Sequence, residues 1–349
     1  MRLRLRIERA AERIWYGRSA WRWPLFPVSL AYRAAVATRA RLYRSGAKPV
    51  VRLPVPVIVV GNVTAGGTGK TPLVIWLAQR LGARGRSPGI VSRGYGGRAT
   101  RWPQRVRPGS SPDLVGDEPV LIATRTGCPV FAGPDRVAAA RALLAEADVD
   151  VVLSDDGLQH YRLGRDFEIA VVDGRRGVGN GWCLPAGPLR EPATRLDAVD
   201  AVVVNVSSSD DARALGFAWP NAISMRLAVG RVYRVVDGKE AALDDFAGGP
   251  VHAVAGIGHP ERFFRTLEQA GLTVLRYPLA DHARIAAHDL PRGGPVLVTE
   301  KDAVKLRDIG RDDVWAVAVD ALVDDEAALL DEIEAALRAV QTEPLEARR

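Results

Sequence analysis

A glycine-rich segment that ends in Gly-Lys-Thr has the residue types that bind nucleotide phosphates. It consists of Thr64, Ala65, Gly66, Gly67, Thr68, Gly69, Lys70 and Thr71. In such a loop, glycines let backbone N–H groups turn toward phosphate oxygens, and a lysine brings positive charge to the β- and γ-phosphates. The hydroxyl after the lysine is placed to bind Mg²⁺. The segment therefore predicts a phosphate-binding loop, with Lys70 as the phosphate contact and Thr71 as the metal contact.

The flanking residues have the pattern that a P-loop requires. A β-branched apolar run from Val55 to Val60 precedes the glycines, and apolar residues at helical spacing follow them: Leu73, Trp76, Leu77 and Leu81. Strand, loop and helix in this order are the structural context of a P-loop. The strict pattern has a glycine where this chain has Thr64. A glycine-rich connection that only happens to end in a lysine therefore stays open as the alternative.

Two adjacent carboxylates end another buried strand. The apolar run from Val149 to Ser154 leads directly into Asp155 and Asp156. A carboxylate at the end of such a strand, downstream of a P-loop, is typical of the acid that anchors Mg²⁺. Two adjacent acids strengthen this interpretation, because a metal offsets their repulsion. For His160, which follows shortly after, a phosphate contact and a structural hydrogen bond both remain open.

Two further polar sites follow predicted strands or begin predicted helices. Ser92 and Arg93 end a short strand, and the carboxyl ends of parallel strands are where ligands bind in open α/β sheets. A solvated basic turn is the alternative for these two residues. Asp117 stands just before Pro119 and an apolar helical run. It is therefore either a helix N-cap or a catalytic carboxylate.

A loop from Gly174 to Pro192 combines glycines and prolines with polar and basic side chains. Asn180 and Arg190 are its candidates for contacts with a polar substrate. The composition is too structured for a flexible linker, so we expect the loop to belong to the folded core.

Alternating strands and helices predict an α/β fold. Near-continuous apolar strands indicate a P-loop NTPase-like, mainly parallel sheet that is covered by helices on both faces. The 349 residues suffice for about two domains. The predicted parts are an N-terminal helical segment at 1–47, a P-loop core at 48–221, a β-ribbon at 222–249 and a smaller α/β domain at 250–349 with a closing helix. Within the ribbon, residues 225–229 and 232–236 alternate like two paired strands, and Asp237-Gly238 is a turn signal.

The basic character of the chain is confined to its N-terminal segment. Residues 1–52 carry a net charge of +11 while the whole chain carries +7, so the remainder is acidic. Seven of the 22 aromatic residues also lie in this segment. Arginine, tryptophan and tyrosine around short apolar patches are typical of a membrane-surface helix. The longest uncharged run, Trp23 to Tyr32, is far shorter than the roughly 20 residues that span a bilayer. The alternatives are a helix packed on the protein's own core and a basic nucleic-acid arm.

Several segments together resemble one family, the tetraacyldisaccharide 4'-kinases of lipid A assembly in Gram-negative bacteria. They are residues 61–72 around the P-loop, Ser92 to Gly96, Gly116 to Pro119, Asp155 to His160, Asn180 to Trp182 with Leu184 to Arg190, Asp281-His282, and Thr299 to Asp302. Thr64 is part of the loop form of this family. Many members continue Asp-His with a second His or Tyr, where this chain has Ala283.

The resemblance implies a lipid kinase that uses ATP and Mg²⁺. It would transfer the γ-phosphoryl group to the 4'-hydroxyl of a tetraacylated glucosamine disaccharide 1-phosphate. Asp117 would accept the hydroxyl proton together with His282, which lies in the second predicted domain, and domain closure would complete the site. The implied location is peripheral, at the cytoplasmic face of the inner membrane, where anionic lipid would attract the basic segment. No nucleic acid and no obligate protein partner are implied.

The competing function is a P-loop regulatory ATPase or GTPase, such as a metallochaperone or a partitioning protein. It would need the P-loop and the acidic strand end. It would not need a basic aromatic segment, the Asp281-His282 pair or the arginine-bearing loop before Pro192. A nucleic-acid-dependent ATPase is supported only by the basic N-terminus.

Overall fold

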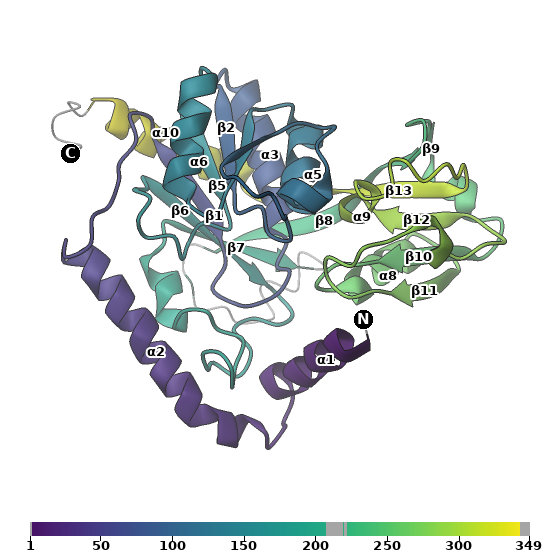
Figure 1. Ribbon diagram of the computed structural model, residues 1–349, viewed down its shortest axis with the longest axis horizontal. Helices are drawn as coiled ribbons and strands as arrows, with labels where there is room; N and C mark the ends of the chain where they lie inside the picture. Colours follow the sequence, from purple (N-terminus) through teal and green to yellow (C-terminus); the bar gives the residue numbers. More distant parts are fainter. Residues whose placement is uncertain (1, 207–218, 220–221, 343–349) are drawn as a thin grey trace.

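One thirteen-stranded sheet runs through the described part of the chain, residues 2–206, 219 and 222–342 of this computed structural model (Figure 1). The strand order is β11-β10-β12-β13-β8-β7-β6-β1-β5-β2-β4-β3, and β9 pairs with β8. The strands are β1 (Val57–Gly61), β2 (Pro88–Ser92), β3 (Gln104–Val106), β4 (Val130–Ala132), β5 (Val151–Asp155), β6 (Phe167–Asp173), β7 (Ala201–Val206), β8 (Ala222–Arg234), β9 (Glu240–Ala241), β10 (Val251–Ala255), β11 (Val274–Pro278), β12 (Val296–Thr299) and β13 (Val314–Val323). The helices are α1 (Arg2–Tyr16), α2 (Arg22–Arg44), α3 (Lys70–Ala83), α4 (Pro112–Val115), α5 (Asp117–Thr126), α6 (Arg136–Glu146), α8 (Pro260–Gln269), α9 (Glu300–Ala303) and α10 (Glu326–Thr342).

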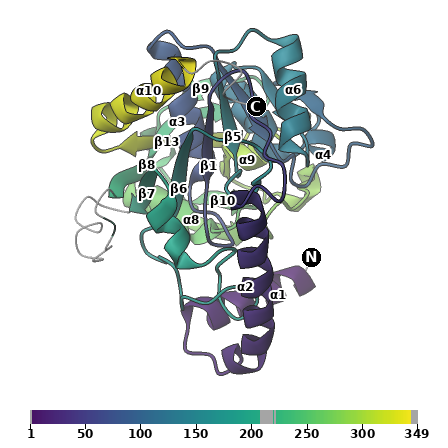
Figure 2. The same cartoon turned by 90° about the vertical axis from the view of Figure 1, so that its left-hand side faces the viewer.

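The centre of the sheet is the strand that leads into the P-loop. All five residues of β1 are buried, and β1 pairs in parallel with β5 on one side and with β6 on the other. Side chains of β1 alternate between two hydrophobic clusters, because successive residues of a strand point to opposite faces. Ile58 packs with Leu73 of α3 and Ile333 of α10, whereas Val59 packs on the face that α6 covers. Figure 2 shows α3 and α10 on one side of the sheet and α6 on the other. The predicted mainly parallel, doubly covered sheet is confirmed.

The C-terminal part of the sheet is joined to the P-loop part by two long antiparallel strands. β8 has 13 residues and pairs with β13 from Met225 opposite Val323 to Arg234 opposite Trp315. Beyond β13 the strands β12, β10 and β11 run parallel, and α8 covers one face through Phe263 and Phe264. A smaller C-terminal α/β unit is therefore present, and β8 and β13 connect it to the P-loop part of the sheet.

The predicted pairing inside the ribbon was wrong. Residues 225–229 and 232–236 do not form two strands, because β8 runs without a break from Ala222 to Arg234. Its main partner is β13, and the turn at Gly238 leads only to the two-residue β9. An alternating pattern shows which side chains share a face of a strand, but it does not identify the neighbouring strand. The exact domain boundaries stay a prediction.

Two N-terminal helices lie outside the sheet. The only buried residue of α2 is Ser29, whose hydroxyl donates to the Cys183 carbonyl at 2.6 Å and accepts from the Ala186 N–H at 2.9 Å. The Tyr32 hydroxyl donates to the Arg190 carbonyl at 3.1 Å. One side of α2 is thus attached to the loop that precedes Pro192. No helix among the described residues is long and apolar enough to cross a membrane.

Candidate active site

The glycine-rich segment forms a turn between β1 and α3 that its neighbours hold in place. Gly69 caps α3 with a φ of 98°, a left-handed conformation that side chains disfavour. A Cβ at this position would also lie 2.4 Å from the Asn205 amide nitrogen. Asn205 donates instead to the Thr68 carbonyl at 2.9 Å, and the Ala65 N–H donates to the Pro188 carbonyl at 2.8 Å. The turn thus leads directly into the N-terminus of α3, and helix N-termini bind anions.

A cleft of about 400 Å³ opens in front of this turn. Residues 66–72 line one wall, and the opposite wall comes from the C-terminal part of the sheet, with Gly258, His282 and Lys301 among its residues. The two walls approach closely, because a Cβ at Gly258 would lie 3.1 Å from the Gly67 backbone nitrogen. The volume lies within the usual range of small-molecule sites. The cleft is therefore shared between the P-loop part and the C-terminal part.

The acidic strand end contributes only one of its carboxylates to the cleft. Asp156 lines it, lies 3.4 Å from the Lys70 ammonium and accepts from Arg190 at 3.1 Å. Burial would raise the pKa of Asp156, but Lys70 and Arg190 outweigh it and hold that pKa well below its usual range. Asp155 lies behind, 1% exposed, and accepts from the Ser92 hydroxyl at 3.0 Å. Burial raises the pKa of Asp155 to about 7, and Glu118 and Asp156 add to the rise.

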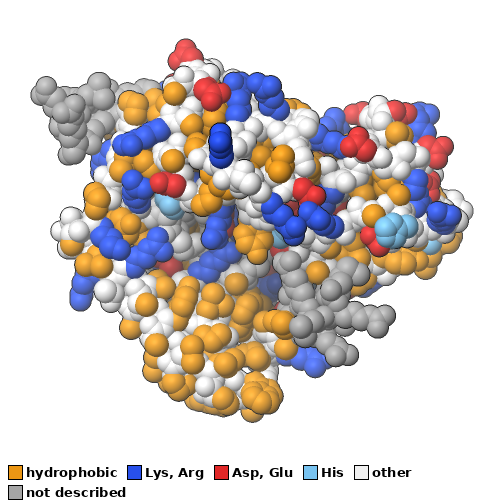
Figure 3. All heavy atoms as spheres, viewed as in Figure 1, with side chains coloured by type: hydrophobic (Ala, Val, Ile, Leu, Met, Phe, Trp, Pro, Cys, Tyr) orange, Lys and Arg blue, Asp and Glu red, His pale blue; other side chains and the backbone are white. Residues whose placement is uncertain are grey.

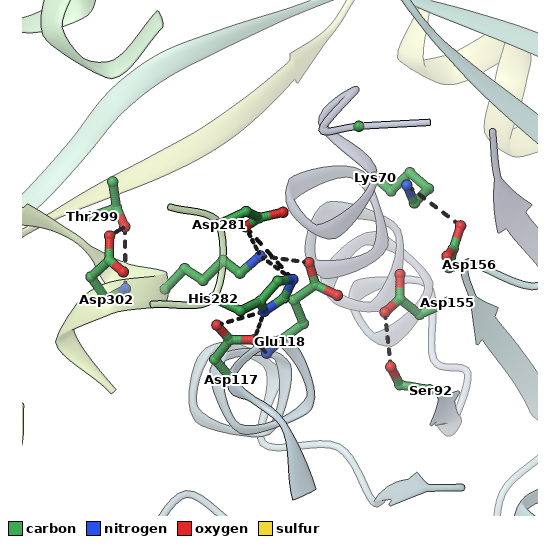
Figure 4. A network of polar contacts seen from close by, with 12 residues as sticks. Lys70, Ser92, Asp117, Glu118, Asp155, Asp156, Asp281, His282, Thr299 and Asp302 are labelled. Carbon is green, nitrogen blue, oxygen red and sulfur yellow. Dashed lines mark hydrogen bonds and ion pairs between the residues drawn. The ribbon is translucent and has the colours of Figure 1, made fainter. Parts of the chain in front are cut away.

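A second group of charged residues faces the P-loop across the cleft (Figure 4). His282 Nδ1 lies 2.9 Å and 3.0 Å from the two carboxylate oxygens of Asp117. Asp117 is the first residue of α5, after the N-cap Gly116, and is 4% exposed. Burial favours its neutral form, but the His282 hydrogen bond and the charges of Lys301 and Lys305 hold the pKa of Asp117 well below its usual range. Asp117 is therefore an anion, and His282 Nδ1 carries the proton that is shared between them.

Two lysines that the sequence analysis did not select complete this group. Lys305 Nζ lies 3.2 Å from Asp117 and 3.0 Å from Asp302, which is fully buried. Lys301 Nζ lies 2.9 Å from Glu118, and Asp281 and His282 Nε2 are each 3.3 Å away. Burial would lower the pKa of Lys301, but Glu118 and Asp117 outweigh it and raise that pKa. Because a lysine ammonium only donates, the Nε2 atom accepts from Lys301. The segment from Thr299 to Asp302, which contains Lys301, was part of the family resemblance. The sequence analysis assigned no role to Lys301 or to Lys305.

The remaining candidate substrate-binding residues from the sequence analysis differ in their position relative to the cleft. Arg93 and Arg190 line the cleft. Ser92 is buried behind it against Asp155. Asn180 does not line this cleft, and its amide donates to the Ala186 carbonyl at 2.8 Å.

For His160, the structure favours the structural hydrogen bond over a phosphate contact. His160 Nε2 lies 3.3 Å from the Arg136 N–H, which donates to it. Burial and the Arg136 charge lower the pKa of His160 to about 4. The imidazole is therefore neutral and accepts a backbone hydrogen bond.

Comparison with known proteins identifies the family. The model of the family described as tetraacyldisaccharide-1-P 4'-kinase matches residues 21–338. The chain belongs to the tetraacyldisaccharide 4'-kinase family. A tetraacyldisaccharide 4'-kinase of Nitrosococcus oceani is 51% identical over 310 residues, which cover 88% of this chain and 89% of the relative. One of Alkalilimnicola ehrlichii is 51% identical over 323 residues, which cover 90% of this chain and 92% of the relative.

A solved structure of a tetraacyldisaccharide 4'-kinase has the same fold. The "apo" form of LpxK from Aquifex aeolicus in complex with ATP superimposes with a TM-score of 0.78 at 29% identity, and the match covers 91% of this chain and 99% of that one. The predicted family, the P-loop NTPase-like fold and the ATP-dependent kinase activity are thus confirmed, and a regulatory NTPase is not favoured. ATP is the phosphoryl donor, and Mg²⁺ is the general partner of such kinases.

The residues around Lys70 fit a Mg²⁺ site. Mg²⁺ prefers oxygen ligands and is usually held by one or two carboxylates together with substrate phosphates and water. Asp156 on the cleft wall and the hydroxyl of Thr71 supply such oxygens next to the predicted phosphate position, whereas Asp155 lies behind them and is bonded to Ser92.

We expect Asp156→Asn to raise the Mg²⁺ concentration needed for half-maximal activity, because the variant loses the carboxylate on the cleft wall. The measurement is the initial rate at saturating ATP over a range of Mg²⁺ concentrations. Asp150→Asn, which changes a partly exposed carboxylate just before β5, is the matched control. An unshifted Mg²⁺ dependence would mean that the acidic pair has only a structural role.

We expect Lys305→Met to raise the pKa of Asp117, since it removes an ammonium 3.2 Å from that carboxylate. Asp117 would then protonate at a higher pH during acidification, which ¹³C NMR of its carboxyl carbon can follow. The variant also leaves Asp302 buried without its cation, so we expect a loss of about 3 kcal/mol in the free energy of unfolding. Lys305→Arg, which keeps the charge, should retain most of both properties. An identical Asp117 titration in Lys305→Met would contradict the assigned cause of its low pKa.

Proposed function

We propose that this enzyme transfers the γ-phosphoryl group of ATP to the 4'-hydroxyl of a tetraacyldisaccharide 1-phosphate. The supporting observation is that one cleft joins the phosphate-binding turn to the Asp117–His282 pair. A regulatory NTPase needs the first of these but has no use for a buried carboxylate–imidazole pair opposite it. Family membership supports the same acceptor, because the relatives are named for it.

The P-loop side of the cleft would neutralise the charge of the transferred group. Phosphoryl transfer depends mainly on positioning and on charge stabilisation. Lys70 and the N–H groups at the start of α3 would hold the β- and γ-phosphates. Arg190 and Arg93 line the same cleft and are the proposed additional contacts with phosphate or sugar oxygens. Mg²⁺, where bound by Thr71 and Asp156 of the strand end, supplies further charge neutralisation.

The opposite side of the cleft would accept the proton of the attacking hydroxyl. A base of this kind must lie within hydrogen-bond reach of the hydroxyl and must be unprotonated. Asp117 is an anion, and it orients His282 through the Nδ1–H hydrogen bonds. We assign the proton acceptor to the Asp117 carboxylate, the unprotonated member of this pair, and the His282 imidazole holds that carboxylate in place through its Nδ1–H. His282 comes from the C-terminal part of the sheet, so closing that part onto the P-loop would complete the site and exclude water.

The N-terminal helices would bring the enzyme to its acceptor. Exposed hydrophobic side chains gather where α1 and α2 meet, including Trp21 at 70%, Trp23 at 58% and Val28 at 56% exposure. Figure 3 shows hydrophobic side chains over this lower end of the molecule. Trp23 and Phe26 pack on Trp182 with ring centroids 5.3 Å and 4.5 Å apart. We call Trp21, Trp23 and Phe26 the aromatic patch. Because a tetraacylated acceptor stays in the bilayer, we infer that this patch makes a peripheral contact with the anionic cytoplasmic face of the inner membrane.

We expect transfer of labelled γ-phosphate from ATP to a lipid A disaccharide precursor in detergent micelles. Asp117→Ala should lower kcat by about 10²–10⁴-fold, the usual range for loss of a general base, while ATP affinity is largely kept. Thin-layer chromatography of the lipid and a nucleotide-binding titration are the two measurements. If wild-type enzyme only hydrolysed ATP and the lipid did not stimulate it, the proposed activity would be wrong. A folded Asp117→Ala variant with near wild-type turnover would show that Asp117 is not part of the mechanism, but it would leave the proposed transfer activity standing.

We expect Trp21→Ser combined with Trp23→Ser to reduce sedimentation with phospholipid vesicles, because both side chains would leave the membrane interface. Leu275→Ser combined with Leu322→Ser is the matched control, since these side chains are 42% and 48% exposed and lie in the C-terminal part. Activity on detergent-solubilised acceptor should be similar in both variants. Equal vesicle binding by the two variants and wild type would show that the aromatic patch does not touch lipid.

A further inference from the structure

A second pocket lies beside the P-loop, and four of its ten lining residues are arginines. Its volume is about 540 Å³, and it is formed by α1, the start of α2, the segment after β6 and α8. Arg22, Arg175, Arg176 and Arg265 line it. His259 belongs to both this pocket and the active-site cleft, so the two are neighbours.

Of the four arginines in the pocket, only Arg176 has a carboxylate partner among the side chains that the structure describes. Arg176 pairs with Glu12, and its guanidinium lies 5.1 Å from the centre of the Tyr16 ring. Among the side chains that the structure describes, no carboxylate pairs with Arg22, Arg175 or Arg265. The Arg22 guanidinium lies 5.5 Å from the centre of the Trp23 ring, and its Nε atom is buried without a hydrogen-bond partner in the described part of the chain. Buried polar groups normally have partners, so this nitrogen indicates a missing acceptor.

The neighbouring acid Asp173 does not supply that acceptor. Asp173 is 4% exposed and already interacts with Arg262 at 3.4 Å and with the N–H groups of Arg175 and Arg176 at 3.0 Å. His259 adds no positive charge to the arginines, since burial and the Arg176 charge lower its pKa to about 4 and leave it neutral. The pocket is therefore suited to an anion with several acceptor oxygens.

The walls of the pocket are fixed to the core and lie beside the aromatic patch. The Trp15 indole donates to the Pro185 carbonyl at 2.9 Å, and the Asn180 N–H donates to the Trp15 carbonyl at 3.0 Å. Arg22 stands between Trp21 and Trp23, which are both exposed. Tryptophan side chains at a membrane surface sit at the level of the lipid headgroups. If the aromatic patch meets the bilayer, Arg22 is at the depth of the lipid phosphates.

We propose that this pocket binds the phosphate of an anionic membrane lipid headgroup. Arginine recognises phosphate oxygens through paired N–H donors. Three arginines around one space, with no carboxylate partner among the described side chains, match this chemistry. The site rests on the proposed membrane contact of the aromatic patch but not on the transfer reaction. The family model begins at residue 21, so the α1 residues of the pocket, Trp15 and Tyr16, lie before the matched region. Headgroup binding would hold α1 against the loop next to the P-loop.

The test compares Arg175→Gln combined with Arg265→Gln and a matched control, Arg107→Gln combined with Arg141→Gln. All four side chains are exposed, and the control pair lies near β3 and on α6, away from α1. With the nucleotide site saturated by Mg·ADP, we expect the pocket variant to bind vesicles of phosphatidylcholine and phosphatidylglycerol about 10- to 30-fold more weakly than the control. Equal affinities of the two variants would overturn the proposal.

A soluble probe separates a pocket from diffuse attraction to the surface. Under the same nucleotide saturation, glycerol phosphate should bind wild type and control saturably in calorimetric titrations and should not bind the pocket variant. No saturable binding to wild type, or equal binding to all three proteins, would overturn the proposal. Loss of glycerol phosphate and inorganic phosphate binding without a change in vesicle affinity would show that the site takes free phosphate, and the assignment to lipid would then be wrong.

Kinase assays in neutral detergent identify whether the acceptor itself fills the pocket. We expect both variants to show the wild-type KM for the lipid acceptor, since no anionic membrane is present. A KM raised only in the pocket variant would mean that the acceptor's own 1-phosphate occupies the site, which overturns the headgroup assignment. Absence of transfer by wild type would count against the proposed function and not against this pocket.

Discussion

The buried charge network around Asp117 holds the two parts of the molecule in the arrangement that creates the cleft. Asp117 belongs to the P-loop part, whereas His282, Lys301 and Lys305 come from the C-terminal part. Separating a buried carboxylate from its partners costs several kcal/mol, because the charges are left unpaired in a poorly solvated place. Arg125 of α5 repeats this pattern through its pairs with Glu300 and Asp320. The proposed catalytic pair is therefore also part of what joins the two halves of the sheet.

Both sides of the cleft hold a residue in a conformation that side chains rarely adopt. Asp156 has a φ of 50° and His282 a φ of 56°. Such strain persists only where the surroundings determine the backbone, and it is concentrated at functional sites. The His282 N–H donates to the Gly256 carbonyl at 3.1 Å, and Asp156 is fixed by Lys70 and Arg190. The strained residues thus point at the same space from opposite sides.

Arg190 links the proposed membrane contact to the acidic strand end. Its carbonyl accepts from Tyr32 of α2, and its side chain donates to Asp156. The loop that carries it also provides the carbonyl that Ser29 binds and the indole that packs on Trp23. A movement of α2 at the membrane would therefore displace this loop, and with it the Arg190 side chain in the cleft. The arginine pocket is formed partly by the same N-terminal helices. The proposed headgroup site, the aromatic patch and the cleft are therefore connected through α1, α2 and this loop.

The sequence by itself determined the features that depend on neighbouring residues. The turn before Lys70, the carboxylates at Asp155 and Asp156 and the parallel α/β sheet follow from local rules for strands, glycine turns and helix starts. Those rules left Asp117 open between a helix-capping and a catalytic role, and His282 entered only through the family resemblance. They also misassigned the partner of β8, and they gave no role to Lys305. Only the tertiary structure decided these points, because Asp117 and His282 are 165 residues apart and meet through the order of strands in the sheet.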